Sequence, residues 1–133
     1  MEWCVIKWAL AQLYKYNSRS FDFSGEFDFK DRIENIEDIL DISITTVNGV
    51  GQNVYDDRYV FDLHIVSKLV LEDANTLEPV EFPIDIEVTE IFDKIDDGEI
   101  NIILTNTIDL EEVIWENVYL ERPMRITKQD NLT

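Results

Sequence analysis

The chain has 133 residues, of which 45% are hydrophobic, and its 29 acidic side chains outnumber its 11 lysines and arginines. This is enough apolar material for the core of one domain, and no apolar run approaches the roughly 20 residues that a membrane-spanning helix needs. The single cysteine, Cys4, excludes an internal disulfide and a cysteine-based metal site. The first residues lack the basic start and cleavage site of a secretory signal, so we expect a cytoplasmic protein.

The formal net charge of -18 is concentrated in the middle of the chain, where residues 33–121 contain only Arg58, Lys68 and Lys94 as basic residues. Binding to DNA or RNA depends largely on cations that contact phosphate, so we expect little direct contact with nucleic acid. Such a charge favours a basic protein as the partner. The alternative is that the acids only keep the surface solvated and the protein soluble.

The first third of the chain contains two predicted helical segments and one strand. Residues 7–16 combine helix-forming residues with apolar positions and predict a short amphipathic helix. Residues 20–29 predict a strand, or a bulged hairpin around Ser24-Gly25, because four phenylalanines share one parity: Phe21, Phe23, Phe27 and Phe29. The isoleucine spacing over residues 33–41 predicts one or two helical turns.

The centre of the chain has the clearest strand pattern. We expect a strand over residues 42–47 and then a loop over residues 48–53, in which Asn48-Gly49 supplies a tight turn. Residues 58–73 show the alternation of a strand, with Asp62, His64 and Lys68 on the polar face. The apolar face carries Tyr59, Phe61, Leu63, Ile65, Leu69 and Leu71.

Residues 79–88 predict the second strand of a long antiparallel hairpin. The even positions are apolar and should face the core, whereas Glu81, Asp85 and Glu87 should face solvent. Pro83 cannot donate a hydrogen bond to a neighbouring strand, which places it at an edge or a bulge. A further strand is expected over residues 99–104.

The last element is predicted to be a helix that begins at a capping box. Asp109 and Glu112 have the spacing with which each side chain can bond the other's backbone amide, and Ile108 can pack on Val113. The inward stripe should consist of Leu110, Val113, Ile114 and Val118, and Pro123 should end the helix. The expected fold is therefore α+β: a curved antiparallel sheet of five or six strands, with a short N-terminal helix and a capped C-terminal helix.

Several of these segments together resemble one known family. The resemblance is carried by a KW-x3-QL start, an FDF-x-GEFDF strand, a YVFDLHI strand, the segment TLEPVEFPIDIEV and the ending NTIDLEEVIWENVYLERPMR. These segments are similar to the YceD family, bacterial proteins linked to accumulation of large-subunit ribosomal RNA. The similarity runs from about residue 7 to residue 126, and its most specific parts are residues 76–88 and 107–125.

The resemblance implies a cytoplasmic, non-enzymatic accessory factor in assembly of the large ribosomal subunit. Many relatives carry cysteines and an arginine in the turn before the LEP motif, where this chain has Asp73-Ala-Asn-Thr76. Neither metal binding nor phosphate contact is therefore implied for this turn. The family pattern begins near Lys7, so we expect residues 1–6 to be an extension, residues 7–121 to form one YceD-like domain, and residues 122–133 to form a flexible basic tail.

Two groups of residues are candidates for binding a partner. Glu78, Glu81, Asp85 and Glu87 would form an acidic face that receives a basic large-subunit ribosomal protein or a pre-ribosomal particle; the alternative is that prolines and acids only protect an edge strand from stray pairing. Trp115, Tyr119, Arg122 and Arg125 would form a second surface, since aromatic residues and arginine dominate binding hot spots. The alternative for this second group is that it covers the edge of the sheet.

No motif predicts catalysis, a cofactor or a metal site. The chain has no glycine-rich phosphate loop and no histidine spacing for a metal, and the acids of residues 93–99 do not follow the spacing of an EF-hand. A hydrolase that uses paired carboxylates would require a concave site with shifted pKa values. A further possibility is an acidic mimic of nucleic acid that sequesters a DNA- or RNA-binding protein.

Overall fold

A computed structural model describes residues 7–13, 19–95, 98, 100–103 and 105–122. The predicted extension over residues 1–6, Arg125 and most of the predicted tail lie outside these residues. The elements in chain order are β1 (Lys7–Ala9), α1 (Leu10–Leu13), β2 (Ser20–Phe27), the 3-10 helix η2 (Lys30–Ile33), β3 (Ile39–Ile42), β4 (Thr45–Tyr55), β5 (Arg58–Glu72), β6 (Pro79–Asp93), β7 (Asn101–Ile102), β8 (Thr107–Asp109) and α2 (Glu111–Glu121).

A six-stranded sheet dominates the fold, and it is open rather than closed into a barrel. The strands follow the order β2-β4-β5-β6-β7, and β3 pairs with β5 beyond the end of β4. The predicted long hairpin is confirmed, because β5 and β6 pair from Tyr59–Phe92 to Glu72–Pro79. All pairings are antiparallel except that of β7 with β6, so the expected α+β class is confirmed while the sheet is mixed at one edge.

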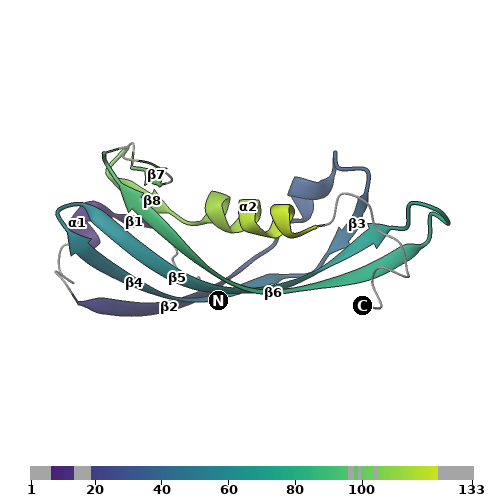
Figure 1. The fold of residues 1–133 in the computed structure, drawn as a ribbon, viewed down its shortest axis with the longest axis horizontal. Helices are drawn as coiled ribbons and strands as arrows, with labels where there is room; N and C mark the ends of the chain where they lie inside the picture. The colour runs from purple at the N-terminus through teal and green to yellow at the C-terminus, as the bar shows by residue number, and fades with distance from the viewer. Residues whose placement is uncertain (1–6, 14–18, 96–97, 99, 104, 123–133) are drawn as a thin grey trace.

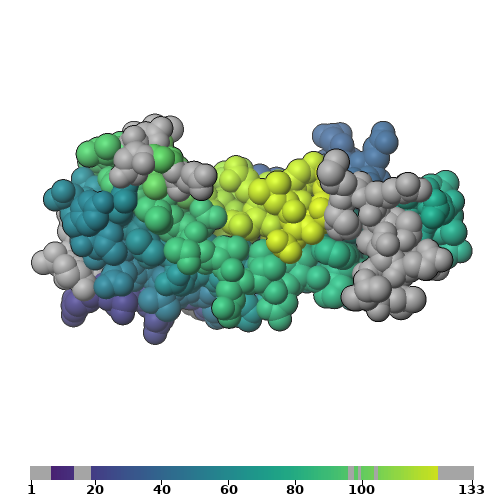
Figure 2. Space-filling view, in the orientation of Figure 1, coloured from purple at the N-terminus to yellow at the C-terminus, as the bar shows by residue number. Residues whose placement is uncertain are grey.

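Helix α2 covers one face of this sheet. In Figure 1 the long strands bow, and α2 lies over their concave side between the β7–β8 end and the β3 end of the molecule. Figure 2 shows α2 along the surface of this side, directly beside β6, where Asn117 Nδ2 donates to Glu90 Oε2 at 2.9 Å. The opposite, convex face carries no described helix or strand.

The core lies between the concave face and α2. All the apolar residues predicted to share one face of β5 are buried, and so is the predicted inward stripe of α2: Leu110, Val113, Ile114 and Val118. Trp8 on β1 closes the aromatic end of this core, since its ring stacks on Phe61 at 5.7 Å and meets Phe21 and Phe23 edge-on. Offset and edge-on ring contacts of this kind add to the stabilisation from burial.

The loop predicted over residues 48–53 is wrong, because these residues lie inside strand β4. Gly49 and Gly51 face the concave side, where the aromatic rings of neighbouring strands occupy the space that a side chain would need. A Cβ atom at Gly49 would lie 2.5 Å from Phe23 Cζ, and one at Gly51 would lie 2.5 Å from Phe21 Cζ. The glycines therefore permit close packing of rings on the strand and do not form a turn. The real turn follows at Asp56, whose φ is 45°.

Two helical predictions are also partly wrong, for a common reason. Of the described residues 7–13 in the segment 7–16, Leu10–Leu13 are helical and Lys7–Ala9 pair with β8 as a strand. In the segment 33–41 only Ile33 belongs to a helix, the short η2, while Ile39–Ile42 pairs with β5. In both cases a partner that is distant in sequence supplies the backbone hydrogen bonds and overrides the local helical spacing.

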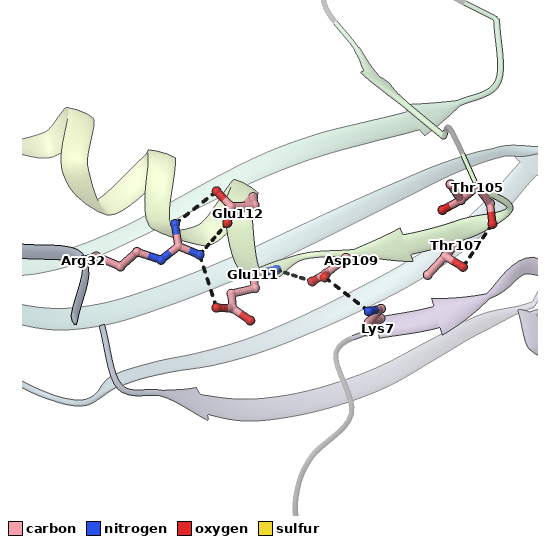
Figure 3. A network of polar contacts seen from close by, with 7 residues as sticks. All are labelled: Lys7, Arg32, Thr105, Thr107, Asp109, Glu111 and Glu112. Atoms are coloured by element: carbon pink, nitrogen blue, oxygen red, sulfur yellow. Dashed lines mark hydrogen bonds and ion pairs between the residues drawn. The ribbon is translucent and has the colours of Figure 1, made fainter. Parts of the chain in front are cut away.

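The predicted capping box at α2 does not form, as Figure 3 shows. Leu110 occupies the N-cap position and no side chain caps the helix there. Asp109 ends strand β8, and its Oδ1 accepts the amide of Glu111 at 2.9 Å. Glu112 turns away toward Arg32 of η2, which it meets at 2.5 Å. Pairing of β8 with β1 keeps Asp109 extended, so the helix begins later than the sequence pattern predicts.

Candidate interaction surface on the outer face of the sheet

We use the name outer face for the convex side of β2, β4, β5 and β6, opposite α2. The strand register aligns the residues of this face into rows that cross all four strands. One row contains Asp22, Val50, Asp62 and Thr89; the next contains Ser24, Asn48, His64 and Glu87; a third contains Glu26, Thr46, Val66 and Asp85. Residues far apart in sequence thus form one continuous surface.

Acidic side chains dominate the outer face, and all of the following are exposed: Asp22, Glu26, Asp62, Glu81, Asp85 and Glu87. The basic or titratable partners in these strands are few. His64 Nε2 lies 2.6 Å from Asp85 Oδ1, and Lys68 Nζ lies 3.3 Å from Glu81 Oε2. Because both pairs are exposed to solvent, each stabilises the fold by less than about 1 kcal/mol. The face therefore keeps a strong excess of negative charge.

A shallow groove of about 690 Å³ crosses the middle of this face. Its polar lining comes from all four strands and includes Asp22, Asn48, Asp62, His64, Glu87 and Thr89. Thr89 Oγ1 donates to Asp62 Oδ1 at 2.7 Å, which fixes the orientation of that carboxylate. Val50 supplies an apolar patch within the groove and is 39% exposed.

The edge formed by β6 explains the position of Pro83. Lys68, which faces Pro83 in the register, directs its amide toward Ser43 Oγ at 2.9 Å and its carbonyl toward the Ser43 amide. In an antiparallel pair, the amide and carbonyl groups of two facing residues either both point toward the partner strand or both point away from it. The Lys68 groups point away from β6, so the Pro83 nitrogen points away from β5, toward the open edge. The predicted edge position is confirmed, and the proline removes no ladder hydrogen bond.

The first predicted group of site residues lies along this strand. Glu81, Asp85 and Glu87 all point outward, as the alternation predicts, and Glu78 is exposed immediately before β6. The turn that leads to Glu78 is organised by the buried Asp73, whose Oδ1 accepts the amides of Asn75 and Thr76 at 2.7 and 2.9 Å. Glu81, Asp85 and Glu87 are therefore held on one side of the hairpin, and Glu78 is exposed at the turn that precedes them.

The second predicted group does not join the first, because it lies with α2 on the opposite side of the sheet. Trp115 packs on Phe29 at 5.3 Å and on Tyr119 at 5.8 Å. The Arg122 guanidinium stacks on the Tyr119 ring at 4.3 Å and donates to Asp38 Oδ2 at 2.6 Å. These contacts tie the end of α2 to the segment around η2, and the rest of the predicted tail lies outside the described residues.

The shifted pKa values in the described part of the chain belong to ion pairs away from the groove. Burial would raise the pKa of Asp93, but hydrogen bonds from Arg58 and from the amides of Lys94 and Ile95 outweigh it and lower that pKa. Arg58 Nε lies 3.0 Å from Asp93 Oδ2, where the pair joins the start of β5 to the end of β6. The bond between Arg32 and Glu112 raises the arginine pKa and lowers that of the carboxyl.

Within the described residues, no group of three or more histidine, cysteine, aspartate or glutamate side chains is arranged to hold a metal ion. No helix in the same residues is long and apolar enough to cross a membrane. The outer face is a broad acidic surface crossed by a shallow groove, a geometry that suits docking of a cationic macromolecule.

Comparison with known proteins gives one clear similarity. The chain is 29% identical over 126 residues to a protein of Bacillus subtilis (strain 168) named uncharacterized protein YlbN, and the match covers 91% of this chain and 73% of that protein. No family model matches the chain, and no solved structure matches it. The similarity spans β2 to α2 and therefore includes every strand of the outer face.

Sequence reasoning missed half of the outer face. Asp22, Glu26 and Asp62 share this surface with the predicted acids of β6, and Val50 and Val66 lie between them. The alternation of β5 already assigned Asp62 to a polar face, whereas the pattern of β2 was used only for its phenylalanines. What the sequence lacked was the strand order, which brings those polar faces onto one side.

Proposed function

We propose that this protein is a non-enzymatic cytoplasmic accessory factor in assembly of the large ribosomal subunit, which acts by binding a basic ribosomal protein on the outer face of its sheet. The observation that carries the proposal is the joining of carboxylates from β2, β5 and β6 into one exposed surface, in which His64 and Lys68 each lie beside a single carboxylate of β6. Such a surface attracts a cationic protein and speeds its association.

The ribosomal part of the proposal rests on the resemblance of the sequence to the YceD family. The segments that carry it include the β6 strand and α2, which are the edge of the acidic face and the helix that supports the sheet from behind. Free ribosomal proteins are strongly cationic because they contact RNA phosphates. An acidic surface can shield the positive charge of such a protein until it is incorporated into the large ribosomal subunit.

Nucleic acid is an unfavourable ligand for the same surface. Binding to a phosphate backbone draws its free energy from cations that displace counterions, and the outer face presents mainly carboxylates. The alternative of a nucleic-acid mimic shares this charge argument but predicts weak selectivity, because a mimic would bind many DNA- and RNA-binding proteins.

A native pull-down tests the proposal. Tagged protein is used to capture partners from the cytosol of its own source, with and without ribonuclease, and the bound proteins are identified. We expect a small basic large-subunit protein to be retained after ribonuclease treatment. Loss of all ribosomal proteins together with the RNA would refute direct binding, and capture of many unrelated nucleic-acid-binding proteins would favour the mimic.

A charge variant locates the binding surface. In the variant Glu78→Gln, Glu81→Gln, Asp85→Asn and Glu87→Gln we expect partner capture to fall at least tenfold, because rim charges control association rates. The fold should persist because these side chains are exposed. A control away from the outer face, Glu34→Gln with Glu37→Gln, removes two exposed charges near η2 and should leave capture unchanged. Equal capture by the wild type and the outer-face variant, on intact folds, would contradict docking at this face.

A further inference from the structure

We infer that the open edge of β2 receives an extended segment of the partner protein, which adds an antiparallel strand to the sheet and places basic side chains beside Asp22 and Glu26. This inference rests on the proposed function for the identity of the partner, and it adds the conformation and the side-chain pattern of the segment that is bound. The backbone geometry of β2 carries it.

The strand register fixes where the backbone groups of β2 point. The Lys68 amide and carbonyl point away from β6, and alternate residues of a strand point to the same neighbour, so His64 points toward Asn48 of β4. The next residue of β4, Gly49, therefore points the other way, toward Phe23 of β2. The remaining residues of β2 direct their amides and carbonyls to the open edge: Ser20, Asp22, Ser24 and Glu26.

These outward groups have no partner in the described part of the chain. Among the described strands, β4 is the one neighbour of β2, and no hydrogen bond between described residues reaches the outward backbone groups of Asp22, Ser24 or Glu26. The register with β4 runs over the whole of β2 without a shift. The edge therefore presents eight residues of regular extended backbone, a length of about 25 Å, with which a further strand can pair.

The opposite edge of the sheet lacks this property. Pro79 and Pro83 of β6 have no amide hydrogen, and the end of β6 is paired with β7. Prolines, lysines, bulges and covering elements are the means by which proteins protect a strand edge from further pairing. Strand β2 has no proline, lysine or register shift. The two edges of one sheet thus differ in a way that favours strand addition at β2.

The side chains of β2 specify the pattern of the added strand. On the outer face, Asp22 and Glu26 are exposed, so the positions directly opposite favour lysine or arginine. On the concave side, Phe23 and Phe27 are only partly buried and favour apolar neighbours. Because residues that face each other across two strands share one side of the sheet, the bound segment should alternate basic and apolar residues.

Other occupants fit this edge less well. A second copy of the chain, paired through its own β2, would extend one acidic face with another and bring Asp22 and Glu26 of the two copies together, which is unfavourable. A helix bonds its own backbone groups and would leave the outward amides of β2 without partners. A parallel strand is slightly less stable per residue than an antiparallel one.

A fluorescent nine-residue peptide of alternating lysine and valine tests the inference on the full chain. In an antiparallel pair, the lysines that face Asp22 and Glu26 direct their amides at β2, whereas the valine amides point away. N-methylation of the interior lysine amides removes those donors, and N-methylation of the valine amides is the charge-matched control. By fluorescence anisotropy we expect the first change to raise Kd at least tenfold and the second to change it less than about threefold.

Variants of the chain locate the binding edge. Ser24→Pro removes one outward donor and, like Pro83, no ladder hydrogen bond; it should raise the Kd of the unmodified peptide at least fivefold, whereas Ser24→Ala keeps the amide and should change it less than about twofold. Asp22→Asn with Glu26→Gln should weaken binding and reduce its salt dependence. Asp85→Asn with Glu87→Gln removes the same charge roughly 14 Å away across the face and should have a smaller effect.

Hydrogen exchange provides a measurement that charge alone would not change. In the free protein the outward amides of Asp22, Ser24 and Glu26 should exchange fast, and the unmodified peptide should slow them at least tenfold. The amides of Phe23 and Gly25, which point toward β4, should change little. Slow exchange of the outward amides in the free protein would show that the edge is already paired and would overturn the inference, whether or not Ser24→Pro folds.

The results separate this inference from the proposed function. Equal Kd values for the unmodified and the lysine-methylated peptides would overturn strand addition even if the pull-down retains a ribosomal protein. A loss of affinity on valine methylation instead would show a parallel strand and overturn the antiparallel arrangement. Binding that depends on the lysine amides and protects the outward amides of β2 would support strand addition even if the captured protein is not ribosomal, in which case the proposed function fails.

Discussion

Replacing Gly51 by alanine tests the packing that turns residues 48–53 into a strand. The added Cβ would lie 2.5 Å from Phe21 Cζ and 2.8 Å from Phe61 Cε2. Contacts below 3 Å require one of the rings to move. Phe61 is completely buried and is held by Trp8, Phe21 and Phe92, so it has little freedom to do so.

Two opposing effects determine how much Gly51→Ala changes the free energy of unfolding. Alanine lowers the entropy of the unfolded chain and favours an extended backbone, which would stabilise the protein by roughly 0.5–1 kcal/mol. Overpacking a well-filled core costs about 1–3 kcal/mol. We therefore expect Gly51→Ala to lower the free energy of unfolding by about 1–2 kcal/mol, which corresponds to a fall in Tm of about 3–8 °C for a domain of this size.

Urea unfolding followed by tryptophan fluorescence measures this change, and a double-mutant cycle identifies its cause. Phe21→Leu shortens the clashing side chain, so the pair Gly51→Ala with Phe21→Leu should lose less stability than the two single changes together. Gln52→Ala, an exposed site on the same strand, is the control and should change stability by less than about 0.5 kcal/mol. A Gly51→Ala protein as stable as the wild type, or strictly additive losses in the cycle, would refute the packing argument.

Two further predictions concern the ion pairs. Asp93→Asn should lower the free energy of unfolding by about 2–3 kcal/mol, because it removes the carboxylate charge that pairs with the largely buried Arg58. The folded protein lowers the pKa of Asp93 from its ordinary value of 3.8. The stability from this pair should therefore be present above pH 3.8 and fade as the pH falls further. If the wild type and Asp93→Asn lost stability equally in acid, this assignment would be contradicted. Arg122→Met should cost about 1–2 kcal/mol through the lost contacts with Asp38 and Tyr119. Arg122→Lys should recover little of this loss because an ammonium cannot both stack and donate in the same way, so full recovery of the urea midpoint by lysine would argue against the stacked geometry.

The sequence by itself determined those features that depend only on the alternation of side chains. The period of two over residues 58–73 and 79–88 identified the central hairpin, its buried face and its outward acids, because successive side chains of a strand point to opposite sides. The same logic identified β2 from its phenylalanines. The inward stripe of α2 followed from helical spacing in the same way.

Where the local sequence signals were weak or ambiguous, only the tertiary structure decided the conformation of the segment. Lys7–Ala9 and Ile39–Ile42 became strands because β8 and β5 supply their hydrogen bonds, and Gly49 and Gly51 belong to a strand because aromatic rings of β2 and β5 fill the space above them. The candidate site was decided in the same way. Alternation assigned Asp62 of β5 and the acids of β6 to polar faces, but the strand order placed β2, β4, β5 and β6 side by side and so made separate polar faces into one acidic surface. Long-range pairing carries this information, since it depends on contacts between residues that no local pattern connects.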